Sequence, residues 1–365
     1  MLSGEFMEKL IGIVSGSKKR DGIQIGMKGY YDTLSKHFRV NWYQCIDPAI
    51  SDTTGFGIPV RGVKFPIPIL EMGINRLFAF PKRFYQRGED LFILADPTLV
   101  GITKKAENVL VKIHDLRPLT AFADSYLTRL MYLHSFNNLQ KVKGVIVTTE
   151  WMANQIKNYL NKEQVILVIA DTHSIEVQPE RKIEGSIDRL KRGIVNITYV
   201  ATDRPYKNIP FFLDLARELT RHDSVIFNFR LVSKISHKTK RIIQNNEIPR
   251  FTVYQNVEDI GSIYEDTDIY LHPSFYEGFG RPIIEAMACG IPVVTNSIEP
   301  FYEIMGGAGK QIPVSNKTDW ISAILQLSEP DFYKIEAKKS LERSMVFDQK
   351  HFEKQLCDEL SRTFR

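Results

Sequence analysis

Residues 269–296 read IYLHPSFYEGFGRPIIEAMACGIPVVTN, and their order of residue types decides the fold. A short apolar run at 269–271 leads into a turn rich in glycine. Pro282 suits the first turn of a helix, where its missing N–H is not needed, and Gly290 suits the left-handed cap that ends a helix. A second apolar run follows at 292–295. Strand, glycine turn, helix and strand in this order are typical of a parallel sheet covered by helices.

The same alternation runs through the whole chain. Short apolar runs predict strands at 10–14, 91–94, 109–113, 145–148, 165–169, 194–200, 225–231, 251–254, 269–271 and 292–295. Helical periodicity predicts helices at 26–37, 122–139, 152–160, 209–221 and 282–288, and two helices within 331–365 with a break near 345–347. We therefore predict an α/β protein with two doubly wound, Rossmann-like domains.

The length of 365 residues exceeds what one hydrophobic core usually organises. Residues 176–193 are charged and have little apolar periodicity, so we place the junction there. The predicted domains are 1–188 and 189–345, with a C-terminal segment 346–365. A cleft between two such domains is a natural ligand site.

Composition excludes several classes of protein. Hydrophobic residues make up 43% and charged residues 25%, which is typical of a globular chain and not of collagen, a disordered chain or a disulfide scaffold. Three widely spaced cysteines without a CxxC pair indicate reduced thiols and argue against zinc. The N-terminus lacks a signal-peptide pattern, and no run of about 20 apolar residues is present. These features predict a cytoplasmic protein.

The net charge of +5 lies in the first half, where residues 1–190 hold 25 Lys and Arg against 20 Asp and Glu. A modest basic excess suits phosphates or acidic lipid headgroups, and it is too dispersed to indicate nucleic acid. Segment 74–87, INRLFAFPKRFYQR, interleaves aromatic and basic residues. It predicts peripheral contact with the inner face of a membrane, although half-buried surface loops share this composition.

The glycine turn at 277–280 feeds a helix N-terminus, which is a binding site for phosphate oxygens. Glu277 and Glu285 flank this turn, and carboxylates accept hydrogen bonds from vicinal hydroxyls. A nucleotide sugar requires a phosphate site that lies between two groups able to accept hydrogen bonds from vicinal hydroxyls. The alternative is that Glu277 is a solvated loop acid and Glu285 a partner of the helix dipole.

Residues 277–296 closely resemble the signature of family 4, the retaining glycosyltransferases with the two-domain GT-B fold. The resemblance implies that Glu277 faces the donor sugar and that Glu285 holds the nucleotide ribose. It also implies that the amides of the turn contact the donor, and the candidate donor-binding residues there are Gly278, Phe279, Gly280 and Arg281. Arg281 replaces an apolar residue that is common in the family.

Residues 194–208, IVNITYVATDRPYKN, predict a buried strand followed by a turn with Arg204 and Lys207. Two cations at the end of a strand can stabilise a departing diphosphate, and the family has an Arg and a Lys here for that purpose. Lys207 aligns with the family's Lys, whereas Arg204 is shifted from the usual Arg position. The alternative is a solvated turn.

Two further candidates lie in the first half. His114 ends the strand at 109–113 and resembles the family histidine that contacts the donor sugar, with Asp115 placed to orient its ring. A histidine of the core is the alternative. Gly22 resembles the family's glycine loop near the donor, and a solvated basic loop is an equal alternative.

Asp266-Thr267-Asp268 spells a DxD motif, which holds a metal in another glycosyltransferase fold, but we interpret Asp266 as a solvated acid at a helix end. The resemblance implies a retaining hexosyltransferase that uses a UDP-sugar or GDP-sugar and no metal, with a glycan, a lipid-linked molecule or another hydroxyl compound as acceptor. It also implies that the C-terminal helix returns to the N-terminal domain. The alternatives are a non-catalytic nucleotide-sugar-binding subunit or a nucleotide-sugar epimerase.

Overall fold

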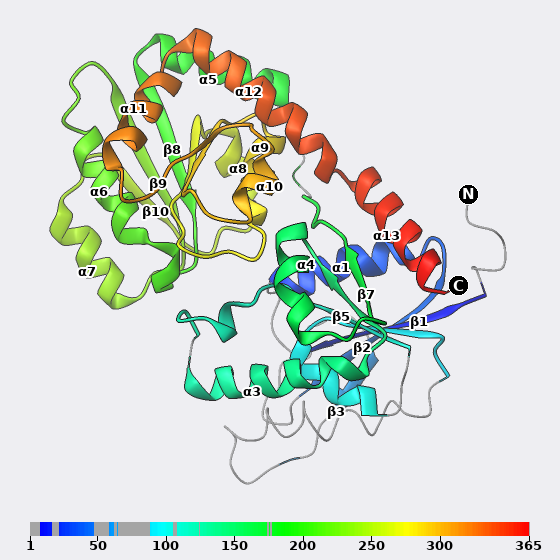
Figure 1. Ribbon diagram of the computed structural model, residues 1–365. Coiled ribbons are helices and arrows are strands. Elements are labelled where there is room, and N and C mark those ends of the chain that lie inside the picture. Colours follow the sequence, from blue (N-terminus) through cyan, green and yellow to red (C-terminus); the bar gives the residue numbers. More distant parts are fainter. Residues whose placement is uncertain are drawn as a thin grey trace. The chain divides into compact units, whose positions relative to one another are not determined.

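A computed structural model describes residues 8–16, 22–46, 58–61, 64, 88–104, 108–123, 125–173, 175 and 177–364. The chain divides into two compact units (Figure 1). Unit 1 comprises Met1–Asp171 and Phe352–Arg365, and unit 2 comprises Thr172–His351. Segment 74–87, for which we predict membrane contact, lies outside the described residues. No helix in the described parts of the chain is long and apolar enough to cross a membrane.

Unit 1 contains a seven-stranded sheet in the order β3-β2-β1-β4-β5-β6-β7, with every neighbouring pair parallel. The strands are β1 (Leu10–Gly16), β2 (Arg39–Ile46), β3 (Ile58–Arg61), β4 (Leu91–Leu94), β5 (Val109–Lys112), β6 (Gly144–Val147) and β7 (Val165–Val168). The described helices that precede β7 are α1 (Gly22–Leu34), η4 (Pro97–Lys104), η5 (Arg117–Leu119), α3 (Tyr126–Asn137), η6 (Leu139–Lys141), α4 (Glu150–Ile156) and η7 (Lys157–Tyr159).

The C-terminal helix α13 (Gln349–Thr363) supplies part of the core of unit 1. Phe352, Leu356 and Leu360 are buried in the same cluster as residues of β1 and α1. The ring of Phe352 lies edge-on to that of Tyr30, with 5.2 Å between centroids. Burial of these apolar side chains holds the end of the chain on unit 1.

Unit 2 contains a six-stranded parallel sheet in the order β10-β9-β8-β11-β12-β13. The strands are β8 (Ile194–Val200), β9 (Ile226–Val232), β10 (Phe251–Tyr254), β11 (Ile269–His272), β12 (Val293–Thr295) and β13 (Lys310–Gln311). The helices are α5 (Pro179–Lys191), η8 (Pro205–Lys207), α6 (Ile209–Leu219), α7 (His237–Asn246), α8 (Ile260–Glu265), α9 (Arg281–Ala288), α10 (Phe301–Met305), α11 (Lys317–Leu327), α12 (Pro330–Ser344) and η9 (Met345–Phe347).

The boundary between the units differs from the predicted position at 188. The segment expected to be a junction forms α5, which begins at Pro179 and belongs to unit 2. Ile183, Ser186 and Leu190 are buried on one face of this helix. Three buried positions spaced by three and four residues are enough to dock a helix that is charged elsewhere.

Strand pairing brings two loops of unit 2 together. β8 and β11 are adjacent and parallel, with Ile197 opposite Ile269 and Thr198 opposite Tyr270. Their carboxyl ends therefore meet at one edge of the sheet, where ligands of such sheets bind. The loop at 201–208 and the loop at 273–280 both begin there.

Candidate functional site

The loop after β8 places Lys207 at this edge. η8 ends at Lys207, and Asn208 follows in the left-handed conformation with a φ of 52° before α6 begins. The Tyr199 hydroxyl donates to the carbonyl of Lys207 at 2.5 Å, and the amide of Phe275 donates to the carbonyl of Tyr206 at 2.7 Å. The first bond holds the loop on β8, and the second joins the two loops.

Glu277 and Lys207 form a largely buried ion pair across the two loops. The Lys207 ammonium donates to Oε1 of Glu277, and each side chain is 12% exposed. Burial by itself would raise the pKa of Glu277, but the charge of Lys207 and the hydrogen bond from His272 outweigh it and hold this pKa at about 2. Glu277 is therefore a carboxylate at every physiological pH.

His272 is a second partner of Glu277 that the sequence interpretation missed. It is the last residue of β11 and is fully buried. Its Nε2 lies 2.8 Å from Oε1 of Glu277, and its Nδ1 lies 3.1 Å from the hydroxyl of Tyr270. Burial lowers the pKa of His272 despite the neighbouring carboxylate, so the ring is neutral near pH 7.

The glycine turn between Glu277 and α9 has a conformation that a larger residue would strain. Gly280 has a φ of 106°, and a Cβ there would lie 3.0 Å from Ile283 Cδ1 and 3.2 Å from Phe301 Cε1. Gly278 and Phe279 are buried, and the ring of Phe279 lies edge-on to that of Phe347. The turn presents the N-terminus of α9 at the carboxyl edge of the sheet, where its amides and dipole attract anions.

Glu285 lies on α9, one turn inside the helix. The Tyr264 hydroxyl donates to its Oε2 at 3.1 Å, and a guanidinium nitrogen of Arg281 lies 3.6 Å from its Oε1. Burial raises the pKa of Glu285 against the influence of Arg281 and Tyr264. Nε of Arg281 is buried and has no hydrogen-bond partner within the described parts of the chain.

Arg204 is not brought into the ion pair. Arg204 is exposed, whereas the side chains of Lys207 and Glu277 are each 12% exposed. The neighbouring Asp203 accepts hydrogen bonds from the amide of Ser236 at 2.6 Å and the hydroxyl of Thr239 at 2.8 Å. The loop therefore fixes Lys207 inside the site and leaves Arg204 at its surface.

His114 and Gly22 belong to unit 1. Nε2 of His114 is 2.9 Å from the carbonyl oxygen of Ala95, so Nε2 carries the proton and donates. Burial and the charge of Lys112 lower the pKa of His114 to about 4. Asp115 accepts the amide of Arg117 at 3.0 Å, and Gly22 is the first residue of α1. The roles predicted for His114 and Gly22 stay predictions.

Both carboxylates of the DxD motif contact arginine side chains of the same unit. Asp268 is fully buried; its two oxygens share the Nε–H of Arg189, at 3.1 and 3.2 Å, and its Oδ1 also accepts from Nη2 of Arg189 at 2.7 Å. Asp266 follows α8 and forms an ion pair with Arg230. Among the described residues no group of three or more His, Cys, Asp or Glu could hold a metal ion.

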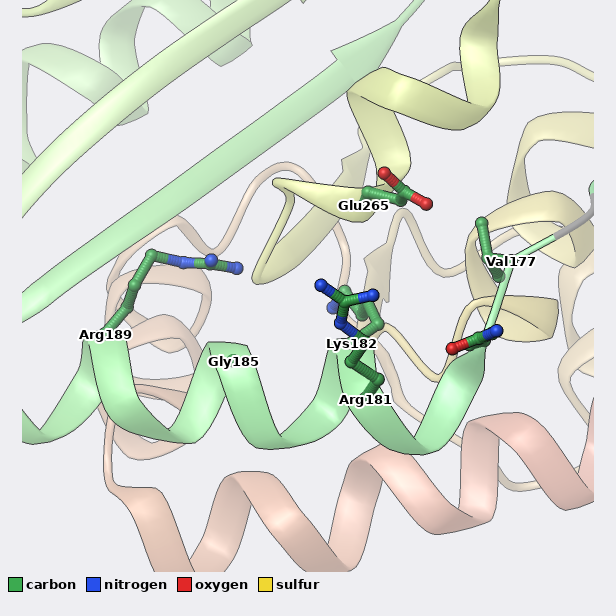
Figure 2. A pocket seen from close by; sticks show the side chains of 7 residues that line it. Val177, Arg181, Lys182, Gly185, Arg189 and Glu265 are labelled. Carbon is green, nitrogen blue, oxygen red and sulfur yellow. The ribbon is translucent and has the colours of Figure 1, made fainter.

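A separate hollow of about 760 Å³ lies beside α5 (Figure 2). Its lining residues are Val177, Gln178, Arg181, Lys182, Gly185, Arg189 and Glu265. Arg189 is already paired with Asp268, and Lys182 donates to the hydroxyl of Tyr333 at 3.0 Å. Two of its three cations are thus engaged within the protein, and we assign it no ligand.

Part of the second unit matches the model of a known protein family. Residues 194–329 match the model of the family described as Glycosyl transferases group 1. O-antigen chain mannosyltransferase B of Escherichia coli is 42% identical over 86 residues, which cover 23% of this chain and 22% of that protein. O-antigen chain mannosyltransferase RfbU of Salmonella typhimurium is 21% identical over 228 residues, 61% of this chain and 62% of that protein. The chain spans less than two thirds of the length of either relative.

Solved structures share the fold over nearly the whole chain. Sucrose-phosphate synthase from Thermosynechococcus elongatus superposes with a TM-score of 0.77 at 18% identity, covering 98% of this chain and 99% of that one. Anabaena HepE in complex with UDP-glucose superposes with a TM-score of 0.75 at 16% identity, covering 97% and 99%. The predicted fold class is confirmed: the chain has the GT-B fold of two parallel-sheet α/β domains, and its residues 194–329 match the model of the group 1 glycosyltransferase family.

Proposed function

We propose that this chain is a retaining glycosyltransferase that moves a hexosyl group from a nucleoside-diphosphate sugar to a hydroxyl of a saccharide or lipid-linked acceptor. The observation that carries the proposal is the buried Lys207–Glu277 pair beside the N-terminus of α9. This corner offers a fixed carboxylate for sugar hydroxyls and fixed positive charge for a diphosphate. Both lie within the segment that matches the glycosyltransferase family.

Each group at the corner has a separate proposed task. Glu277 accepts hydrogen bonds from hydroxyls of the donor sugar through Oε2. Both of its hydrogen bonds from within the described chain go to Oε1, which leaves Oε2 for the ligand. Glu285, whose Oε2 is already held by Tyr264, accepts the ribose hydroxyls.

Positive charge at the corner stabilises the leaving group. The bond between the anomeric carbon and the diphosphate oxygen breaks, and negative charge grows on the diphosphate. Lys207 and the amides at the start of α9 stabilise that charge because they are held in place before the reaction. The acceptor oxygen then bonds to the anomeric carbon on the same face, and its proton passes to the departing phosphate oxygen. Arg204, at the surface of the loop, adds a further cation to the approach of the donor.

The donor is a hexose, and mannose is the first one to test. Five of the relatives that the chain matches are named as mannosyltransferases, whereas HepE was solved with UDP-glucose. A panel of GDP-mannose, UDP-glucose and their sugar-free nucleotides therefore separates the two candidate donors. The names of the O-antigen relatives support a saccharide acceptor.

The test is an assay of nucleoside diphosphate release with each donor, with and without saccharide acceptors, followed by NMR of the anomeric proton in the product. We expect acceptor-dependent release and a product with the donor's anomeric configuration. Glu277→Ala should reduce release by at least about 100-fold. Binding of a nucleotide sugar without release would instead identify a binding subunit. Conversion of the donor sugar without an acceptor would indicate an epimerase.

A further inference from the structure

We propose that His272 is a positioning residue, which fixes Glu277 by donating a hydrogen bond from Nε2 and thereby leaves Oε2 of Glu277 directed to the donor sugar. The inference rests on the proposed function for its effect on turnover. The hydrogen bond itself is a property of unit 2 and is tested independently below.

Two hydrogen-bond donors share one carboxylate oxygen of Glu277. Lys207 and His272 both bond to Oε1 of Glu277. A carboxylate held by one donor can rotate about its last bond and exchange its two oxygens. Lys207 at the end of η8 and His272 at the end of β11 both hold Oε1 and so oppose that rotation, because it would break two hydrogen bonds to a charged group in a buried site.

The neighbours of the His272 ring determine its tautomer. Nε2 of His272 faces a carboxylate, so an unprotonated Nε2 would place two lone pairs against each other. Nε2 therefore carries the proton, and Nδ1 is an acceptor. The hydroxyl of Tyr270 lies 3.1 Å from Nδ1 and 3.4 Å from the carbonyl of Val200. Donation to the nearer Nδ1 supports the same tautomer.

Neighbouring groups restrict the orientation of the His272 ring. The His272 ring lies edge-on to Phe301, at 5.2 Å and 89°, and edge-on to Tyr199, at 5.6 Å and 82°. Its main-chain carbonyl accepts the amide of Asn296 at 3.1 Å. The hydroxyl of Ser274 is 3.2 Å from Nε2, farther than Oε1 of Glu277. The imidazole is thus held from several sides, and its Nε2–H is directed at Glu277.

The variants separate hydrogen bonding from packing. His272→Phe keeps an aromatic ring and removes the donor, whereas His272→Gln restores an N–H close to the position of Nε2. We expect His272→Phe to lower kcat roughly 10- to 100-fold, the usual effect of losing a hydrogen bond to a charged group, with a smaller change in KM. His272→Gln should recover most of this loss. His37→Phe is the matched control, because it removes a histidine whose Nε2 lies 2.9 Å from Oε1 of Glu353 in unit 1. The kcat of this control variant should equal that of the wild type.

A second measurement does not depend on activity. In protein labelled with ¹⁵N-histidine, the His272 resonances are those missing from His272→Gln. We expect them to report the tautomer with the proton on Nε2, and Tyr270→Phe to shift the tautomer equilibrium toward Nδ1. If no donor is turned over by the wild-type protein, the proposed function fails, and the NMR result still decides the hydrogen bond.

Three results would overturn the proposal. One is a folded His272→Phe variant with the kcat of the wild type. Another is equal loss in His272→Phe and His272→Gln, which would show that the packing of the ring matters and donation does not. The last is a His272 imidazole with its proton on Nδ1.

Discussion

Replacing Lys207 with methionine leaves the Glu277 carboxylate buried with one donor, and the structure sets the size of the penalty. A pKa of about 2 for Glu277, against an ordinary value of 4.5, corresponds to about 3 kcal/mol in favour of the folded carboxylate. Lys207 is the strongest influence that lowers this pKa. We therefore expect Lys207→Met to lower the free energy of unfolding of unit 2 by about 3 kcal/mol at pH 7.

Urea denaturation, followed by circular dichroism, measures this loss in a double-mutant cycle with Glu277→Gln. Each single variant leaves one buried charge without its partner, so the double variant should be less destabilised than the sum of the two by about 1–3 kcal/mol. Arg221→Met is the control, because it removes an exposed pair with Glu218 on α6 and should cost less than about 1 kcal/mol. Strict additivity in the cycle would refute the argument that the pair is coupled.

The pH dependence of stability follows from the same pair. The pKa of Glu277 is lower in the folded protein than in the unfolded chain, so its contribution is complete above about pH 4.5. This contribution is lost as the pH falls toward 2. Lys207→Met should lack most of this acid-sensitive contribution. A variant whose stability falls as steeply as that of the wild type between pH 4.5 and pH 2 would show that Lys207 does not lower the pKa of Glu277.

Three other predictions follow from the described contacts. Gly280→Ala should destabilise unit 2 by about 1–3 kcal/mol in thermal unfolding, because its Cβ would crowd Ile283 at a φ of 106°; an unchanged Tm would contradict the strained turn. The His114 ring should titrate near pH 4 in NMR, so stability should fall as the pH drops from about 6.5 toward 4; a titration near 6.5 would contradict this. Turnover should persist in EDTA, because Lys207 and α9 supply the positive charge; loss of turnover that Mg²⁺ or Mn²⁺ restores would show that a metal takes part.

The parts of the fold that the sequence predicted best are strands buried on both faces. Residues 91–94 and 194–200 were predicted as strands with the bounds of β4 and β8, whose residues are nearly all buried. Continuous apolar runs between turn residues give a strong signal because both faces of a parallel sheet are covered. The helix α9 was also located to within one residue, since Pro282 and Gly290 mark its ends.

Elements with mixed composition escaped prediction. β2 contains Arg39, Asn41 and Gln44 among its eight residues, so its apolar run is broken. α5 is highly charged and docks through few apolar positions, which periodicity alone did not reveal. Such segments are held by tertiary packing, which a local pattern does not record.

The candidate site was predicted only in part for a similar reason. Glu277 and Lys207 stand out as charged residues in turns after apolar strands, and the structure joins them. His272 reads as the end of an apolar strand, and its hydrogen bond to Glu277 depends on how the turn at 273–276 folds back. A polar residue at the carboxyl end of a central parallel strand, five residues before an acid, was the available signal.

Calorimetric titration of nucleotide sugars tests most directly whether the corner at the ends of β8 and β11 binds the donor. We predict that GDP-mannose or UDP-glucose binds the wild-type protein with one site and that Glu285→Ala weakens this binding by at least about 10-fold, because a hydrogen-bond acceptor for the ligand is lost. Glu218→Ala, at an acid on α6 in the same unit, should leave the affinity unchanged. Equal affinity in the wild type and in Glu285→Ala, or no nucleotide binding at all, would contradict the account.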